Sequence, residues 1–210
     1  MPSPDQPRKH FSMIRGFHLA DFLTLGNAAC GVAAVFCAMA YGRDPAIAWF
    51  YAAVLLAPAA FAFDVLDGRV ARSRQQHSAL GRELDSLADV ISFGVAPASL
   101  AFAAGMSGAW DWIALLYFVC CGVSRLARYN VTAEAMSKDT GKVTYFEGTP
   151  IPTSIGIVAL LGLAVASGHI DERLWFGSYR IGFAGLHPLS IVYGLSGSAM
   201  ISATLRIPKP

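Results

Sequence analysis

One stretch organises this chain: Asp64-Val-Leu-Asp67-Gly68-Arg-Val-Ala71-Arg72, then eight residues, then Gly81-Arg-Glu-Leu-Asp85-Ser-Leu-Ala-Asp89. The first two acids are three residues apart and the last two are four apart, so on helices the members of each pair share a face. Apolar runs flank the stretch, Ala46–Phe63 before it and Val90–Ala104 after it. The sequence therefore predicts four carboxylates at the facing ends of two membrane-length helices, where ionisable groups are costly and usually functional.

Four carboxylates this close need positive charge between them to stay ionised. Oxygen-only ligands favour Mg²⁺, Mn²⁺ or Ca²⁺ over Zn²⁺, and two such ions suit a phosphoryl-type displacement. Gly68 leaves room for a ligand, Ala71 and Gly81 do so less specifically, and the Arg72 guanidinium suits a phosphate. The alternative is that the acids pair with nearby arginines, and the spacing of four acids favours the metal site over it. Those arginines are Arg69, Arg72, Arg74 and Arg82.

The composition indicates a membrane protein. Of the 210 residues, 55% are hydrophobic and 14% are charged, whereas soluble domains carry about a quarter charged residues. The formal net charge of +2 is too small to indicate a nucleic-acid partner. The four cysteines lie in apolar runs without zinc or CxxC spacing, so we interpret them as small buried side chains. The five histidines share no face or spacing, and we assign them no chemistry.

Six apolar runs reach or approach the roughly 20 residues that cross a bilayer, which predicts an all-α integral membrane protein with six transmembrane helices. The expected spans are Leu19–Tyr41, Ala46–Arg69, Leu84–Ala104, Trp110–Tyr129, Ile151–Ser167 and Phe183–Leu205. Thirteen of the 16 Lys and Arg residues fall on one side of these spans. The positive-inside rule therefore predicts that both termini and the acidic stretch are cytoplasmic, in a multi-pass protein of the inner or plasma membrane. We expect a cytoplasmic or interfacial segment (1–18), a transmembrane domain (19–205) and a cytoplasmic tail (206–210).

The pattern Asp-x2-Asp-Gly-x2-Ala-Arg-x8-Gly-x3-Asp-x3-Asp resembles the signature of the CDP-alcohol phosphotransferase family, and every fixed position is present. The resemblance implies a homodimeric membrane enzyme with two divalent cations, Mg²⁺ or Mn²⁺, with Ca²⁺ as a structural substitute. It implies that Asp64, Asp67 and Asp85 hold one ion, and that Asp64, Asp85 and Asp89 reach the second. Such an enzyme cleaves a CDP-linked lipid or alcohol, releases CMP and passes the phosphoryl-bearing part to a hydroxyl group.

Further residues are candidates for the CDP-donor site. Asn27 lies inside the first span, where it either bonds another helix or, as the resemblance implies, lines the nucleotide site. Many relatives carry Asn-x-x-Thr here, and Cys30 stands at the Thr position. Ser78 is either a diphosphate contact or an ordinary loop serine, and we interpret Asp21 as an interfacial acid or helix cap. The donor-binding set is Asn27, Asp67, Gly68, Ala71, Arg72, Ser78 and Gly81.

Three further segments resemble the phosphatidylserine synthase branch of the family, which transfers a phosphatidyl group from CDP-diacylglycerol to L-serine. They are Ile91-Ser-Phe-Gly-Val-Ala-Pro97, Arg125-Leu-Ala-Arg128-Tyr-Asn130 and Phe146-x-Gly148-x-Pro150-x-Pro152. Arg125 and Arg128 share a helix face. One of them suits the serine carboxylate and the other an anchoring role, and the sequence does not say which. The expected acceptor-binding residues are Arg125, Arg128, Asn130 and Lys142.

The expected reaction is displacement at the β-phosphorus of CDP-diacylglycerol, with Asp89 as the catalytic general base on the serine hydroxyl. Glycerol-3-phosphate, inositol phosphate or a second lipid are the alternative acceptors, and an archaeal ether lipid is the alternative donor anchor. An ion-coupled transporter would also use buried Asp residues. That class predicts inverted repeats and discontinuous helices, which the sequence does not indicate.

Overall fold

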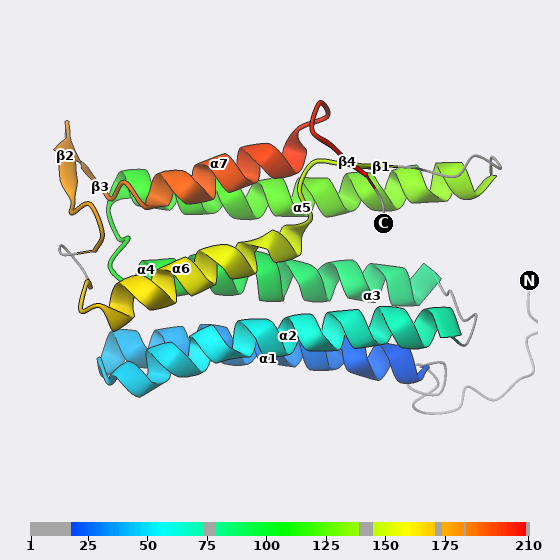
Figure 1. Cartoon of the computed structure of the whole chain (residues 1–210), viewed down its shortest axis with the longest axis horizontal. Coiled ribbons are helices and arrows are strands. Elements are labelled where there is room, and N and C mark those ends of the chain that lie inside the picture. The colour runs from blue at the N-terminus through cyan, green and yellow to red at the C-terminus, as the bar shows by residue number, and fades with distance from the viewer. Residues whose placement is uncertain (1–17, 74–78, 139–144, 171–173, 183, 209–210) are drawn as a thin grey trace, which may run out of the picture.

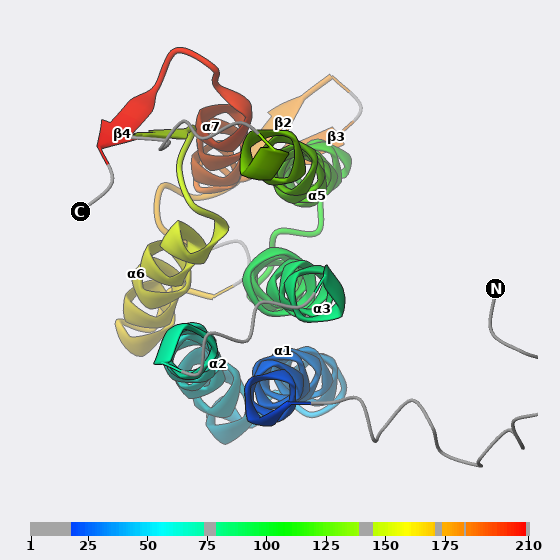
Figure 2. The same ribbon diagram turned by 90° about the vertical axis from the view of Figure 1, so that its right-hand side faces the viewer.

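The computed structural model describes residues 18–73, 79–138, 145–170, 174–182 and 184–208. Figure 1 and Figure 2 show the long helices running side by side along one axis as a bundle. The helices are α1 (Leu19–Arg43), α2 (Ile47–Ser73), α3 (Ala79–Asp89), the π-helix η2 (Val90–Val95), α4 (Ala96–Ala103), α5 (Ala109–Lys138), the 3-10 helix η3 (Ile151–Thr153), α6 (Ser154–Ala166) and α7 (Ser190–Ile201). The strands are β1 (Tyr145–Glu147), β2 (Tyr179–Ile181), β3 (Ala184–Leu186) and β4 (Arg206–Pro208).

Four helices in the described residues are long and apolar enough to cross a membrane. They are α1, α2, the continuous helix Leu80–Ala103 and the part of α5 from Ala109 to Val131. Helices α6 and α7 have 13 and 12 residues, a length of about 18–20 Å at 1.5 Å per residue, against roughly 30 Å of hydrocarbon. The chain is therefore a mostly helical membrane protein with four full-length candidate spans, where the sequence predicted six.

The predicted span Phe183–Leu205 differs from the structure at both ends. Residues Ala184–Leu186 form β3, and α7 covers only Ser190–Ile201. Pro188 lies two residues before α7, where its missing backbone N–H costs no helical hydrogen bond. Two small antiparallel sheets accompany the helices, in which β1 pairs with β4 and β2 with β3. The structure is otherwise consistent with the predicted all-α membrane fold, whereas the six spans and the orientation of the termini stay predictions.

Helices α1 and α2 form a closely packed antiparallel pair (Figure 2). Their contact uses small buried side chains, which let helix backbones approach each other in a membrane without a hydrophobic driving force. These side chains are Ala34 and Ala38 on α1 and Ala53, Ala57 and Ala60 on α2. The pairing brings the beginning of α1 beside the end of α2, where the acidic stretch starts.

A buried polar pair holds the β2–β3 hairpin at the opposite end of the bundle (Figure 1). Asp111, at the start of α5, is fully buried, and its Oδ1 accepts the backbone N–H of His187 at 2.8 Å. Its Oδ2 lies 2.7 Å from His187 Nδ1. The indole N–H of Trp110 donates to the Ile181 carbonyl at 3.1 Å. His187 is therefore a structural residue, far from the acidic stretch.

The segment before α6 is fixed against the end of α7. Gly148 has φ +73°, and a Cβ there would lie 2.2 Å from the Met200 carbonyl oxygen, so only glycine fits. Its N–H donates to the Leu205 carbonyl at 2.8 Å, and the N–H of Thr149 donates to Ala199 at 3.1 Å. The Phe-x-Gly-x-Pro-x-Pro segment thus joins α6, α7 and the β1–β4 sheet.

Candidate active site

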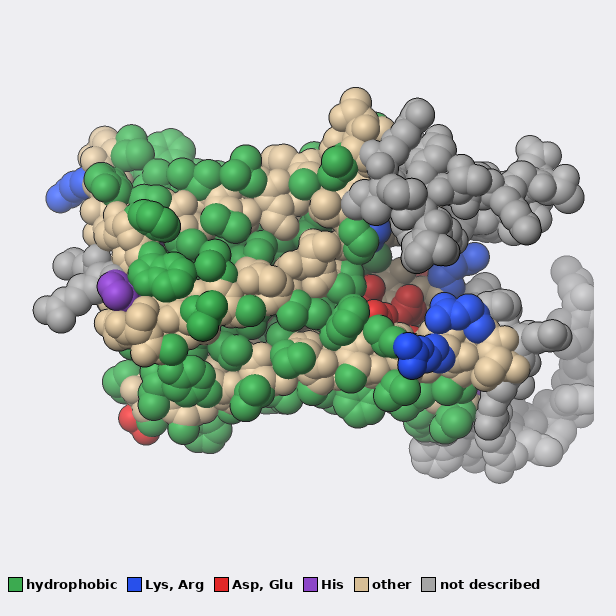
Figure 3. Space-filling model, viewed as in Figure 1, with side chains coloured by type: hydrophobic (Ala, Val, Ile, Leu, Met, Phe, Trp, Pro, Cys, Tyr) green, Lys and Arg blue, Asp and Glu red, His purple; other side chains and the backbone are tan. Residues whose placement is uncertain are grey.

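Three carboxylates from two helices converge at one end of the bundle. Asp64 and Asp67 on α2 and Asp85 on α3 each offer an oxygen, and the three oxygens lie within 4.8 Å of one another. Asp67 is buried, and the other two are half-buried. Figure 3 shows the acidic side chains in a recess at this end, with Lys and Arg side chains beside it. The helical spacing of the motif and the packing of both α2 and α3 against α1 together build this group.

The donor set of this group fits a divalent cation. All the ligand atoms are carboxylate oxygens, which Mg²⁺, Mn²⁺ and Ca²⁺ prefer. Asp85 Oδ1 is buried and has no hydrogen-bond partner among the described residues. No arginine in that part of the chain forms an ion pair with the four aspartates of the motif. Buried carboxylate oxygens without a partner are strongly unfavourable, so the arrangement favours a metal over the alternative of simple acid–arginine pairs.

Two side chains of α1 hold these acids in place. The Thr24 hydroxyl donates to Asp67 Oδ2 at 2.6 Å, and the Asn27 amide donates to Asp89 Oδ1 at 3.2 Å. All four side chains are buried. Asp89 lies outside the 4.8 Å group, yet it interacts electrostatically with Asp64 and Asp85. One face of α1 therefore reaches a carboxylate on each of the two motif helices.

Asn27 has a second polar atom directed into buried space. Its Oδ1 has no hydrogen-bond partner among the described residues, although the residue is fully buried. The amide that bonds Asp89 therefore keeps a free acceptor, which suits a donor group on a ligand. Asp21, six residues earlier, accepts the backbone N–H of His18 at 2.7 Å, which confirms its interpretation as a helix cap.

The remaining donor-site candidates lie along α2 and α3. A Cβ at Gly68 would meet the Arg72 guanidinium at an ordinary 3.4 Å, and the three nearest atoms all belong to Arg72. The protein's own packing therefore does not require glycine there, whereas room for a ligand would explain it. Arg72 is exposed and interacts electrostatically with Asp67. Ala71 and Gly81 are half-buried, and Ser78 lies outside the described residues.

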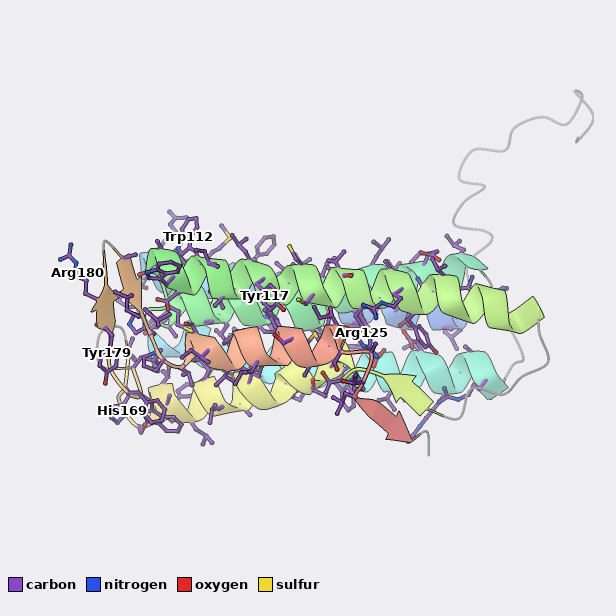
Figure 4. All side chains as sticks on the ribbon, turned by 90° about the horizontal axis from the view of Figure 1, so that it is seen from above. Trp112, Tyr117, Arg125, His169, Tyr179 and Arg180 are labelled. Carbon is purple, nitrogen blue, oxygen red and sulfur yellow. The ribbon has the colours of Figure 1, made fainter. Side chains whose placement is uncertain are left out.

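The structure distinguishes the two arginines of α5. Arg125 is half-buried, interacts electrostatically with Asp89, and its Nε has no hydrogen-bond partner among the described residues. Figure 4 shows it on α5 near the end of α7. Arg128 is exposed, and its Nη2 lies 3.5 Å from the Ile201 carbonyl. Arg125 is therefore the arginine associated with the acids, and Arg128 contacts the end of α7.

Asn130 contacts α3 rather than the acidic group. Its amide donates to Ser86 Oγ at 3.0 Å and to Glu83 Oε2 at 3.3 Å, and Ser86 donates back to Asn130 Oδ1 at 3.3 Å. These bonds join α5 to α3 on the helix that carries Asp85. Lys142, the other acceptor candidate, lies outside the described residues.

Sequence reasoning missed two polar residues that contact this site. Thr24 lies three residues before Asn27, so their shared helix face was available as a signal. Ser92 is buried, and its hydroxyl donates to the Asn27 carbonyl at 2.8 Å. No local spacing identifies that contact, because it joins residues 65 positions apart.

Comparison of the sequence with known proteins identifies relatives of one family. A family model described as CDP-alcohol phosphatidyltransferase matches residues 17–192. The CDP-diacylglycerol–serine O-phosphatidyltransferase of Saccharomyces cerevisiae is 42% identical over 207 residues, covering 96% of this chain and 74% of that protein. The protein of the same name from Mycobacterium tuberculosis is 32% identical over 167 residues, 79% of this chain and 55% of that protein. An archaetidylserine synthase from Methanothermobacter thermautotrophicus is 38% identical over 141 residues, 65% of this chain and 54% of that protein.

The extent of these matches decides the family, since the model spans most of the chain and includes all four aspartates of the motif. The yeast protein is similar along nearly the whole chain. This chain belongs to the CDP-alcohol phosphatidyltransferase family.

Proposed function

We propose that this protein transfers the phosphatidyl group of CDP-diacylglycerol to the hydroxyl of L-serine, giving phosphatidylserine and CMP. The observation that carries the proposal is the convergence of Asp64, Asp67 and Asp85, with Asp89 and Arg125 close enough to interact electrostatically. We assign these groups the roles of a cation-binding site, a general base and a carboxylate-binding group. The names of the yeast and mycobacterial relatives support serine as the acceptor.

Asp64, Asp67, Asp85 and Asp89 would hold two divalent cations, Mg²⁺ or Mn²⁺, with Ca²⁺ as a structural substitute. When bound, the ions supply positive charge to the diphosphate and to the departing CMP. Thr24 fixes the orientation of Asp67 through its 2.6 Å hydrogen bond. Residues that orient metal ligands in this way usually affect metal affinity as well.

The donor headgroup would lie along the ends of α1, α2 and α3. Gly68, Ala71 and Gly81 leave room for it, and Arg72 reaches the same region as a phosphate-binding group. The unpaired Oδ1 of Asn27 is suited to accept a hydrogen bond from the nucleotide. Ser78 remains a proposed diphosphate contact. The acyl chains would stay in the bilayer.

The acceptor reacts between Asp89 and Arg125. The serine hydroxyl oxygen attacks the β-phosphorus, its proton passes to Asp89, and the bond from that phosphorus to the oxygen of CMP breaks. One Asp89 oxygen accepts the Asn27 amide, and the described residues form no hydrogen bond to the other, which suits a general base. Arg125 presents an unpaired buried Nε to bind the serine carboxylate. Lys142 remains a second proposed carboxylate contact.

We further propose that residues 19–205 form a six-pass homodimeric domain in the inner or plasma membrane, with both termini and the active site in the cytoplasm. The excess of Lys and Arg on the acidic side supports this orientation. The short α6 and α7 would each cross with the help of their flanking segments. The family assignment argues against the transporter alternative.

The decisive experiment is an acceptor panel on the purified protein in nanodiscs. CMP release from CDP-diacylglycerol is followed with L-serine, glycerol-3-phosphate or inositol phosphate, and the lipid product is identified by mass spectrometry. Asp67→Asn serves as the inactive variant, and Asp44→Asn, an exposed acid at the far end of α1, serves as the matched control. Serine-dependent CMP release in the wild type and in Asp44→Asn, lost in Asp67→Asn, supports the proposal.

Two outcomes would change the proposed substrates. CMP release with another acceptor but not with serine would keep the chemistry and overturn the acceptor. A preference for an ether-linked CDP-lipid over CDP-diacylglycerol would move the donor assignment towards that of the archaeal relative, an archaetidylserine synthase.

A further inference from the structure

The helix that carries Asp89 changes its geometry directly after this residue. The π-helix η2 runs from Val90 to Val95 and joins α3 to α4. A π-helical turn is rare and occurs frequently at functional sites. It inserts one extra residue into the hydrogen-bonding pattern, so it rotates α3 relative to α4. The direction in which Asp89 points therefore depends on how this turn is anchored.

Ser92 anchors the turn to α1. It is buried, with 2% of its surface exposed, and its hydroxyl donates to the Asn27 carbonyl at 2.8 Å. In an α-helix that carbonyl already accepts the N–H four residues later, at Gly31, and its second lone pair is free for Ser92. A Cβ at Gly31 would lie 2.5 Å from Ser92 Oγ and 2.8 Å from its Cα. Glycine at position 31 thus permits the contact.

Asn27 on α1 consequently contacts both the π-helical turn, at Ser92, and the residue directly before the turn, Asp89. The backbone of Asn27 accepts a hydrogen bond from Ser92, and its side chain donates one to Asp89 Oδ1 at 3.2 Å. Ser92 and Asp89 are three residues apart at the start of the turn. Two attachments to one residue fix both the position of the turn and its rotation about the helix axis.

We infer that Ser92, seated against Gly31, is a positioning residue that aims Asp89 at the acceptor hydroxyl through the π-helical turn. The inference rests on the proposed role of Asp89 as the general base. Ser92 touches neither substrate nor metal in this account. A displacement of about 1 Å at a reacting group can lower the rate about 10²-fold, so loss of the anchor should lower kcat and leave donor binding nearly unchanged.

The test compares Ser92→Ala with a matched control, Ser190→Ala. Ser190 is fully buried and also donates to a backbone carbonyl, that of His187, at 2.7 Å, but at the far end of the bundle. Kinetics are measured with whichever acceptor supports CMP release, varying acceptor and donor separately, and Tm is measured for each variant. We expect kcat of Ser92→Ala to fall roughly 10- to 100-fold with donor KM within about threefold, and Ser190→Ala to lower Tm alone.

A double variant separates positioning from general stability. If Ser92 acts through Asp89, adding Ser92→Ala to Asp89→Asn should cause no further loss of the residual kcat, because residues that act as a unit are not additive. An additional loss equal to that in the wild-type background would overturn the inference, as would wild-type kcat in Ser92→Ala. If Ser92→Ala does not fold, Ser92→Cys keeps a weak donor of similar size and should show an intermediate kcat; unchanged kcat there also overturns it. Absence of CMP release by the wild type with every acceptor would instead refute the proposed function.

Discussion

Arg125→Lys tests which group binds the acceptor carboxylate. Arg125 is half-buried, interacts electrostatically with Asp89 and leaves its Nε unpaired among the described residues. Lysine keeps the positive charge but replaces a planar fork of donors with a single ammonium group. The substitution therefore removes bidentate recognition of a carboxylate while the local charge stays the same.

The expected magnitude follows from one lost charged hydrogen bond. Such a bond contributes about 1.5–3 kcal/mol, which corresponds to a rise of roughly 10- to 150-fold in the KM for serine. The donor KM should change little, since Arg72 and the metal-binding acids lie on other helices. Arg128→Lys is the matched control, because Arg128 is exposed and bonds only weakly to the end of α7 at 3.5 Å. Its serine KM should stay within about twofold of wild type, as is usual for surface substitutions.

The assay is steady-state CMP release with serine varied at saturating CDP-diacylglycerol and then the reverse. An unchanged serine KM in Arg125→Lys would refute the reasoning and move the carboxylate to Lys142 or to a metal ion. Equal effects of Arg125→Lys and Arg128→Lys would show that the structural distinction between the two arginines has no functional meaning. A rise in donor KM instead of serine KM would assign Arg125 to the diphosphate.

Three further predictions concern the acids. Chelation with EDTA should abolish CMP release and added Mg²⁺ or Mn²⁺ should restore it, and full activity in a thoroughly chelated sample would contradict metal dependence. Thr24→Val, which keeps the shape but removes the hydrogen bond to Asp67, should raise the half-activating metal concentration about 10- to 100-fold; Thr24→Ser should restore it, and an unchanged metal titration in Thr24→Val would refute the orienting role. Asp89→Asn should lower kcat about 10²–10⁴-fold with a smaller effect on donor KM than Asp64→Asn, and near-native turnover would remove Asp89 from the base role.

The sequence predicted those parts of the site that depend on local geometry. The separations of three and four residues between the acids translate directly into shared helix faces. Four of the six apolar runs correspond to helices that are long enough to cross a membrane in the described residues. The cap at Asp21 also follows from a local rule, since its partner is only three residues away.

Features that depend on contacts between distant segments were not predictable in the same way. The Thr24–Asp67 bond joins residues 43 positions apart, and the Asp111–His187 pair joins residues 76 apart. Each three-residue strand is too short to show an alternating pattern, so the sequence did not predict the two sheets. The π-helix leaves no periodic signal over six residues, and its Ser92 packs closely on Gly31, a residue 61 positions earlier in the chain.

Helix α1 has a larger role in this site than its single predicted residue suggested. The acids come from α2 and α3, and the connection between these helices, residues 74–78, lies outside the described part of the chain. Within that part, α1 contacts an acid on each helix, Asp67 through Thr24 and Asp89 through Asn27. Because Thr24 and Asn27 are one turn apart on a single rigid helix, the distance between the two acids is set by the α1 backbone. Close packing of α1 on α2 through small side chains keeps the distance between these two acids fixed. The four carboxylates repel one another when they are ionised. The hydrogen bonds from Thr24 and Asn27 oppose that repulsion, and both of these side chains are uncharged.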